Sequence, residues 1–428
     1  MRLYAEMPDV KALLLKGEFG LEKESLRIDE NGNMAHTPHP FPEEKHIVRD
    51  FCENQTEINT PVLKSAKEAV QSLEKYYVQI QKRLAELPNR EYLWPFSNPP
   101  YIRTEDDVPV AQFEGDDAAK TDYRYYLSDR YGRYKMAFSG IHVNFSFADE
   151  LLQKSFWYSS EADYLGYKNQ LYVKLAKQMA VYGWILVAVT AASPLLDTSY
   201  MEKGRQGGEV FNGMASVRCS EIGYWNYFTP IFDYSDIQAY ADSIQSYVND
   251  GLLAYTSELY YPIRLKPKGK NNLDTLRRDG VNHIELRMFD LNPLVPVGVD
   301  ERDVEFAHLL LVWLASLPDQ TVLNKDQVQA AQNFKNAAHY DLKTVKIVAP
   351  NGEVHTVAQA ALNVIASMKE FYKDYSGEVQ EILDFEEAKF VDGDNRYAWK
   401  IRKDFSGEYV KKGLELAKER AKQAIQIM

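Results

Sequence analysis

The sequence lacks the features that mark a secreted, membrane-bound or nucleic-acid-coating protein. It has only two cysteines, Cys52 and Cys219, in 428 residues, so no disulfide framework is predicted. The N-terminus shows no basic segment followed by an apolar run, which makes the cytoplasm the expected compartment. The net charge is −12, and a chain this acidic offers no general surface for nucleic acid or anionic lipid. We therefore expect neither nucleic acid nor a membrane as a partner.

Long apolar runs are scarce. Residues 178–196 form the one uncharged stretch that is long enough to cross a bilayer. This stretch contains Gln178, Gly183 and the helix-breaking pair Ser193-Pro194, so a buried central helix is favoured over a membrane span. Repeats, low-complexity tracts and linker-like segments are missing too, which predicts a single domain over residues 1–428, rich in helices from about residue 302.

A phosphate-binding P-loop is also missing. The glycine-rich segment 204–208 has neither the glycine spacing nor the Lys-Ser/Thr pair of that motif. An ordinary surface loop is favoured there, with a mobile lid over a charged substrate as the alternative. Residues 119–136 are dense in tyrosine and arginine, and in so acidic a chain they indicate the wall of a polar small-molecule pocket rather than a nucleic-acid site.

The sequence does contain segments with an alternating pattern of polar and apolar residues. Residues 20–28, 139–147 and 282–289 alternate at period two, which predicts strands with one apolar face and one polar face. Strand pieces are also expected at 47–51 and 55–61. Apolar spacing predicts helices at 64–87, 167–192, 235–256, 302–317, 353–374 and 406–427. The fold class expected is α+β, with helices covering one face of the sheet.

The polar faces of these strands carry acids, a histidine and an arginine. Glu22 and Glu24 project from the first strand, His142 from the second, and Glu285 and Arg287 from the third. The region 47–61 contributes two further acids, Asp50 and Glu57. Carboxylates with one imidazole suit Mg²⁺ or Mn²⁺ better than zinc, and neighbouring arginines suit phosphate or carboxylate groups. Phosphoryl transfer is the reaction class that needs this combination.

Each of these residues also has a structural interpretation. Glu22 and Glu24 suit a solvated edge strand, His142 alone is more often a hydrogen-bonded structural residue, and Arg218, Glu285 and Arg287 individually fit internal ion pairs. The argument for a site is their joint occurrence opposite cleanly apolar faces. Cys52 and Cys219 are interpreted as buried packing residues rather than thiol switches.

Five motifs occur in order along the chain and resemble those of bacterial glutamate-cysteine ligase, also called gamma-glutamylcysteine synthetase. The resemblance runs from about residue 20 to about residue 310, and it extends to the N-terminal ligase module of bifunctional glutathione synthetases. The motifs are Gly-Leu-Glu-Lys-Glu-Ser-Leu-Arg (20–27), Asp-Phe-Cys-Glu-Asn-Gln-Thr-Glu (50–57), Ser-Gly-Ile-His-Val-Asn-Phe-Ser (139–146), Val-Arg-Cys-Ser-Glu-Ile-Gly-Tyr (217–224) and Ile-Glu-Leu-Arg (284–287).

The resemblance implies a mostly antiparallel sheet, curled into a funnel with helices on its outer face, as in glutamine synthetase. It also implies metal ligands, a cysteine pocket and anion-binding catalytic arginines. The ligands that the resemblance implies are Glu22, Glu24, Asp50, Glu57, His142 and Glu285; the pocket residues are Phe51, Tyr123, Leu127, Tyr224 and Tyr260; and the arginines are Arg124, Arg218 and Arg287.

The activity implied is ATP-dependent ligation of glutamate to cysteine through a gamma-glutamyl phosphate, with ATP as co-substrate and Mg²⁺ or Mn²⁺ as cofactor. Some relatives carry a second, ATP-grasp domain that adds glycine; the 428 residues end before such a domain, so only the first step is expected. Two alternatives stay open: a ligase of the same fold with a different acceptor amine, and a non-catalytic sensor of nucleotide or amino acid. The sequence does not indicate the oligomeric state.

Overall fold

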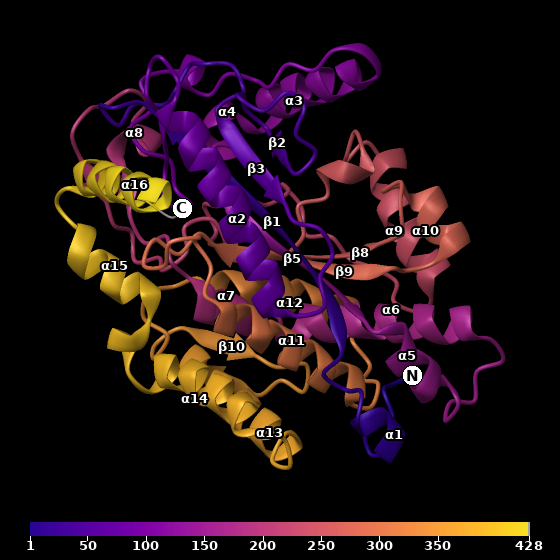
Figure 1. Ribbon diagram of the computed structural model, residues 1–428. Coiled ribbons are helices and arrows are strands. Elements are labelled where there is room, and N and C mark those ends of the chain that lie inside the picture. The colour runs from indigo at the N-terminus through magenta and orange to yellow at the C-terminus, as the bar shows by residue number, and fades with distance from the viewer. Residues whose placement is uncertain (427–428) are drawn as a thin grey trace.

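The chain is organised around one seven-stranded sheet (Figure 1). In this computed structural model, which describes residues 1–426, the strand order is β2-β3-β1-β5-β9-β8, with β4 beside β1. Every neighbouring pair in the sheet is antiparallel, which confirms the expected fold class. The strands are β1 (Gly17–Ile28), β2 (Ile47–Arg49), β3 (Gln55–Asn59), β4 (Tyr92–Leu93), β5 (Gly140–Phe147), β8 (Ile263–Lys266) and β9 (His283–Asp290).

Helices cover the apolar face of this sheet. α2 (Ala66–Ala85) begins at Ser65, whose hydroxyl accepts a hydrogen bond from the Glu68 backbone amide, and its apolar stripe packs on β1. α6 (Tyr164–Tyr182), α7 (Trp184–Thr190) and α11 (Glu301–Ser316) complete the layer. His308 of α11 lies against Phe19 of β1 and Phe145 of β5. The opposite face of the sheet is left to polar side chains.

The helix expected at 167–192 is broken into two. α6 and α7 are bent by 57° at Gly183. A Cβ at that glycine would come within 2.6 Å of the Met179 carbonyl oxygen and 2.9 Å of the Phe334 ring, so the close packing at the bend requires glycine. Among residues 1–426, no single helix has the length and hydropathy needed to cross a membrane, and only the bent α6–α7 pair meets those criteria as a unit.

Two other helix predictions are partly wrong. Residues 353–374 begin with β11 (Val354–Thr356), the second strand of a hairpin with β10 (Lys346–Val348), and only then form α13 (Val357–Phe371). The helix expected at 235–256 is shorter, because α9 (Ile237–Asn249) ends before Gly251, where φ is +73°. The remaining elements are α1 (Pro8–Lys11), η1 (Glu105–Asp107), η2 (Gly115–Asp117), α3 (Ala118–Tyr131), α4 (Arg133–Met136), α5 (Asp149–Phe156), β6 (Leu196–Asp197), α8 (Thr198–Met201), β7 (Glu209–Val210), η3 (Thr256–Glu258), α10 (Leu273–Asp279), α12 (Asn324–Ala337), α14 (Gly377–Val391), η4 (Gly393–Asn395), α15 (Tyr397–Phe405) and α16 (Tyr409–Gln426).

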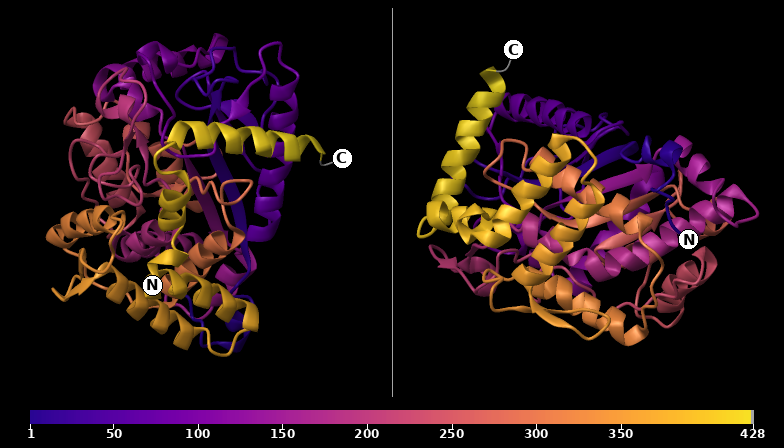
Figure 2. Two further views of the ribbon diagram at one scale, coloured as in Figure 1. Left: turned by 90° about the vertical axis from the view of Figure 1, so that its left-hand side faces the viewer. Right: turned by 90° about the horizontal axis from the view of Figure 1, so that it is seen from below.

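The C-terminal helix α16 returns to the N-terminal half of the chain and crosses α2 (Figure 2). Gly413 of α16 lies close against Trp94, since a Cβ there would come within 2.3 Å of the Trp94 ring. Trp94 and Tyr409 meet edge to face, with ring centroids 5.5 Å apart. The two ends of the sequence are therefore packed into one structure.

Candidate active site

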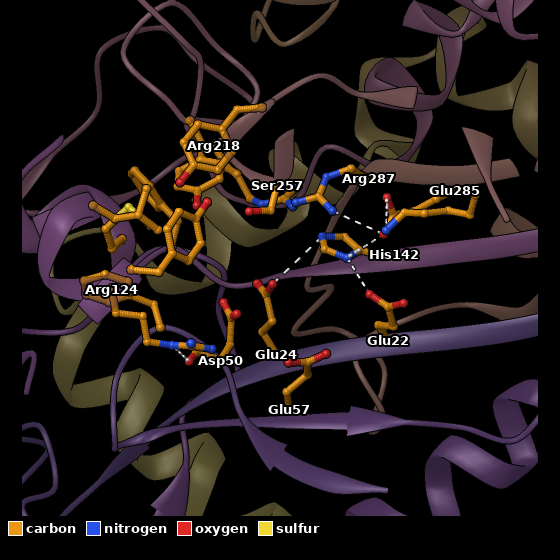
Figure 3. A pocket seen from close by; sticks show the side chains of 18 residues that line it. Glu22, Glu24, Asp50, Glu57, Arg124, His142, Arg218, Ser257, Glu285 and Arg287 are labelled. Atoms are coloured by element: carbon orange, nitrogen blue, oxygen red, sulfur yellow. Dashed lines mark hydrogen bonds and ion pairs between the residues drawn. The ribbon is translucent and has the colours of Figure 1, made fainter. Parts of the chain in front are cut away.

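A cavity of about 230 Å³ opens on the polar face of the sheet (Figure 3). Strands β1, β3, β5, β8 and β9 supply its floor, and α3 with the segments around residues 218–224 and 257–260 supplies its walls. Every site residue named from the sequence lines it. These are Glu22, Glu24, Asp50, Phe51, Glu57, Tyr123, Leu127, Arg124, His142, Arg218, Tyr224, Tyr260, Glu285 and Arg287.

Strand register explains why the polar side chains meet. Glu22 pairs with His142, Glu24 with Glu57, and Asn144 with Glu285, and directly paired residues share a face. A β-bulge adds to this arrangement, because two residues of β9, at 287 and 288, lie opposite His142 alone. Such an extra residue reorients the side chains beside it.

His142 is the centre of the acidic cluster. Its Nδ1 lies 2.8 Å from Glu22 Oε2 and 3.8 Å from Glu285 Oε1, and its Nε2 lies 3.9 Å from Glu24 Oε1. Burial favours the neutral form of Glu22, but the hydrogen bond with His142 and the charges of His142 and Lys266 together outweigh burial and lower the pKa of that carboxyl. Burial also raises the pKa of Glu285, yet Arg287 and Lys266 hold it well below its usual range. Both carboxylates are therefore ionised at neutral pH.

Two other acids of the cavity are short of compensating charge. Burial and the neighbouring Asp50 carboxylate raise the pKa of Glu24 to about 8, although its Oε2 accepts a hydrogen bond from the Gly140 amide at 2.8 Å. Burial and the same carboxylate raise the pKa of Glu57 well above its usual range. Buried acids in mutual repulsion call for a cation among them.

The donor set fits a hard divalent cation. Glu22, His142 and Glu285 each offer one ligand atom, and these atoms lie within 4.8 Å of one another. Within residues 1–426, Oε2 of Glu285 accepts no hydrogen bond although it is buried, and the Lys266 ammonium lies 3.4 Å from it. Carboxylates with one imidazole suit Mg²⁺ or Mn²⁺, as the sequence predicts. Which of the six predicted ligands bind an ion stays a prediction.

Arginines reach the same space from three directions. Arg287 Nη1 lies 3.2 Å from Glu285 Oε1. Arg124, on α3, donates from Nε to the backbone oxygen of Asp50 at 2.6 Å. Arg218 passes directly over Gly140, where a Cβ would lie only 2.3 Å from its Cζ, so the glycine leaves room for the guanidinium. Three cations facing a cluster of acids can bind a phosphate or carboxylate group.

An aromatic wall stands opposite the acids. The rings of Tyr224 and Tyr260 meet with centroids 4.2 Å apart, and Tyr123 lies on the neighbouring face of α3. Both cysteines are buried just outside this wall, and burial raises the pKa of the Cys219 thiol to about 11 and that of Cys52 further still. Buried, protonated thiols agree with packing residues and disfavour redox switches.

Sequence reasoning missed four residues that line the cavity. Lys266 lies on β8, where it alternates with Leu265, so the short pattern Ile-Arg-Leu-Lys at 263–266 carries the signal that would have placed it on the polar face. The others lie outside the motifs, on segments with no periodic pattern. The four are Met136, Phe138, Ser257 and Lys266. The loop 204–208, considered as a lid, is exposed and does not line this cavity.

The sequence matches known proteins over nearly its whole length. A model of the glutamate-cysteine ligase family matches residues 5–248 and 228–337. The glutathione biosynthesis bifunctional protein GshAB of Listeria monocytogenes is 32% identical over 432 aligned residues, which cover 97% of this chain and 56% of that protein. The protein of the same name from Clostridium perfringens is 31% identical, covering 95% and 54%. The chain thus spans about half the length of the curated relatives it matches.

Comparison with solved structures leads to the same family. A bifunctional glutathione synthetase from Pasteurella multocida superposes with a TM-score of 0.84 at 26% identity, covering 98% of this chain and 54% of that one. A glutamate-cysteine ligase from Francisella tularensis, crystallised with AMP, gives 0.85 at 22% identity, covering 96% and 89%, and shows the shared fold. Since the family model, the identity to relatives and the fold point the same way, this chain belongs to the glutamate-cysteine ligase family.

Proposed function

We propose that the protein joins the γ-carboxylate of L-glutamate to the amine of L-cysteine at the expense of ATP. The products are γ-glutamylcysteine, ADP and phosphate, which is the first step of glutathione biosynthesis. The observation that carries the proposal is the convergence of acids, an imidazole and three arginines on one cavity beside an aromatic wall. Membership of the ligase family supports it.

The reaction has two displacements. A γ-carboxylate oxygen of glutamate attacks the terminal phosphorus of ATP, the P–O bond to ADP breaks, and an acyl phosphate forms. The amine nitrogen of cysteine then attacks the acyl carbon, phosphate leaves, and the amine loses a proton. Both steps build negative charge on oxygen, which cationic groups must offset.

The chain's own residues have separate parts in this scheme. Glu22, His142 and Glu285 would hold a divalent cation, with Glu24, Asp50 and Glu57 available for others. A bound Mg²⁺ or Mn²⁺ supplies neutralisation of phosphate charge. Arg287, Arg218 and Arg124 would bind the transferred phosphoryl group and substrate carboxylates.

The acceptor amine would sit against the aromatic wall. A pocket of this kind excludes water from the reacting amine and selects the acceptor by size and polarity. The residues that would form it are Phe51, Tyr123, Leu127, Tyr224 and Tyr260.

The test is phosphate release from ATP in the presence of Mg²⁺ and glutamate, with and without cysteine. We expect release to depend on all four components and γ-glutamylcysteine to accumulate in equal amount. A panel of amines then distinguishes acceptors, and a clear preference for an amine without a thiol would replace cysteine in the proposal. Binding of ATP or glutamate without ADP production would instead indicate a sensor.

A further inference from the structure

A fully buried carboxylate, that of Glu258, lies behind the aromatic wall and outside the cavity. Its Oε1 accepts a hydrogen bond from the Tyr131 hydroxyl at 2.7 Å and lies 2.8 Å from Nε of Arg130. Its Oε2 accepts from the Tyr126 hydroxyl at 3.0 Å and from the Ala254 amide at 2.7 Å. One side chain thus joins three residues of α3 to the segment 254–260.

Both partners of this junction carry cavity residues. α3 presents Tyr123, Arg124 and Leu127 to the cavity, whereas the segment 254–260 presents Ser257 and Tyr260. Figure 1 shows α3 at the edge of the molecule, away from α11 and the helices packed around it. The distance between the two walls therefore depends on the contacts that join them. Glu258 makes the three hydrogen bonds and ion pairs described between the C-terminal half of α3 and the segment 254–260, and the ring contacts Tyr126–Tyr255 and Tyr131–Tyr260 accompany them.

The segment 254–260 is itself held firmly from its other sides. Asn226 accepts from the Tyr260 amide at 2.7 Å and donates to the Glu258 backbone oxygen at 2.9 Å. Arg264, on β8, donates to the backbone oxygens of Ser257 and Leu259. Because the segment is fixed to the sheet, the adjustable partner at the junction is α3.

We propose that Glu258 is a positioning residue that sets the width of the acceptor pocket by holding α3 against the segment 254–260. The inference rests on the proposed function, since it assigns the acceptor amine to this side of the cavity. Glu258 touches no substrate; it acts through Tyr123 and Leu127 on one side and Tyr260 on the other. Hydrogen bonds to a buried carboxylate are strong, and a buried donor left without its acceptor is costly, so the geometry is tightly fixed.

The experiment compares the wild type with Glu258→Gln and Tyr126→Phe in the same phosphate-release assay. Glutamine at position 258 keeps the side-chain volume but places an N–H group among the groups that donate to Glu258. Phenylalanine at position 126 removes one of those donors, the Tyr126 hydroxyl. We expect Glu258→Gln to raise KM for cysteine about tenfold, the effect of one lost bond to a charged group, with a smaller rise for Tyr126→Phe. KM for glutamate and for ATP should change by less than about twofold, because their other proposed contacts lie outside α3 and Arg124 is held separately by the backbone oxygen of Asp50. Preference for cysteine over 2-aminobutyrate should fall.

The matched control is Asp303→Asn. Asp303 is also buried and accepts hydrogen bonds from Lys389 at 2.8 Å and Tyr397 at 3.1 Å, in contacts between α11 and the C-terminal helices rather than at the cavity. This variant should lose thermal stability with all three KM values unchanged. If Glu258→Gln changes the three KM values together, or lowers only the melting temperature as Asp303→Asn does, Glu258 is merely structural and the inference is wrong.

Hydrogen exchange gives a readout that does not need turnover. Glu258→Gln should speed amide exchange in residues 118–131 more than in 254–260, and Asp303→Asn should leave both unchanged. Unaltered exchange in α3 would overturn the inference whether or not the protein is a ligase. Absence of cysteine-dependent phosphate release by the wild type would overturn the proposed function alone.

Discussion

The carboxylate of Glu285 faces two cations and an imidazole, with Arg287 at 3.2 Å, Lys266 at 3.4 Å and His142 at 3.8 Å. These neighbours keep it ionised despite burial. A permanently charged oxygen ligand beside two flexible cations is suited to hold a metal ion and at the same time to orient the groups that bind phosphate.

Replacing this charge with an isosteric amide tests that role. We expect Glu285→Gln to lower kcat roughly 100-fold and to weaken Mn²⁺ binding, measured by calorimetry. The fold should persist, because Ile284, Leu286 and Met288 still fill the core face of β9. The control is Glu221→Gln, because Glu221 forms an ion pair with His339 outside the cavity. Near-normal turnover with unchanged Mn²⁺ affinity would remove Glu285 from the ligand set.

At the scale of elements, strand β5 carries a glycine where an arginine side chain packs directly on the strand. Gly140 of β5 lies beneath the guanidinium of Arg218, and Gly20 of β1 lies beside Asn144, where a Cβ would find its nearest atom at 3.7 Å. The two glycines occupy similar strands, yet only the first has no room for a methyl group.

Gly140→Ala should therefore displace the Arg218 guanidinium while leaving the sheet intact. We expect kcat/KM to fall by up to about 100-fold, the size of effect that a small misplacement of a group at the reaction site can have. The melting temperature should change little, because only the far end of the flexible Arg218 side chain has to move. Gly20→Ala should be close to wild type in both. Equal activity of the two alanine variants would argue against a role for Arg218 in catalysis.

Elements with a strong pattern were predictable, and those fixed by packing were not. The strands around Glu22, His142 and Glu285 alternate cleanly, so their faces follow from period two. The bend at Gly183 and the hairpin before Val357 are different, because close approach at a glycine and a turn at Gly352 with φ +84° decide them. Local composition in both places is compatible with helix, and tertiary contacts override it.

Ten of the fourteen predicted site residues lie in the five motifs, and the other four, Tyr123, Arg124, Leu127 and Tyr260, follow from the family resemblance. All fourteen predicted residues line the cavity, but the strand register that brings them together, and the bulge opposite His142, cannot be read from one sequence. Glu258 escaped notice because a lone glutamate in an irregular segment has no pattern; its importance depends on contacts with Tyr126 and Tyr131, which come from a distant helix.

For the whole molecule, the packing of α16 against the sheet buries two cations. Lys23 of β1 is 4% exposed, with Nζ 4.5 Å from the centre of the Tyr77 ring, and within residues 1–426 it forms no described ion pair with an acid. Burial, with a contribution from Arg420 of α16, lowers the pKa of Lys23 from 10.5 to about 7. Folding therefore favours loss of the proton from the Lys23 ammonium near neutral pH.

The sign of the resulting pH dependence follows from proton binding. Between about pH 7 and 10.5 the unfolded chain holds a proton on Lys23 that the folded protein has lost, so the free energy of unfolding rises with pH. Below pH 7 Lys23 is charged in both states, and the full cost of burying its charge lowers the stability of the fold. Relative to Lys23→Met, the wild type should gain up to about 1.4 kcal/mol per pH unit between pH 7 and 9, measured by urea unfolding. Parallel curves for the two proteins would show that Lys23 stays charged in the folded state.

The pairing of β1 with β5 and of β5 with β9 has a consequence for biosynthesis. The cluster takes Glu22, His142 and Glu285 from strands separated by more than a hundred residues each, and pairings so distant form slowly. A ribosome must release the chain to about residue 290 before Glu22, His142 and Glu285 can come together. Nascent chains that end earlier contain Glu22 but lack strand β9, so the cluster of Glu22, His142 and Glu285 is not yet formed.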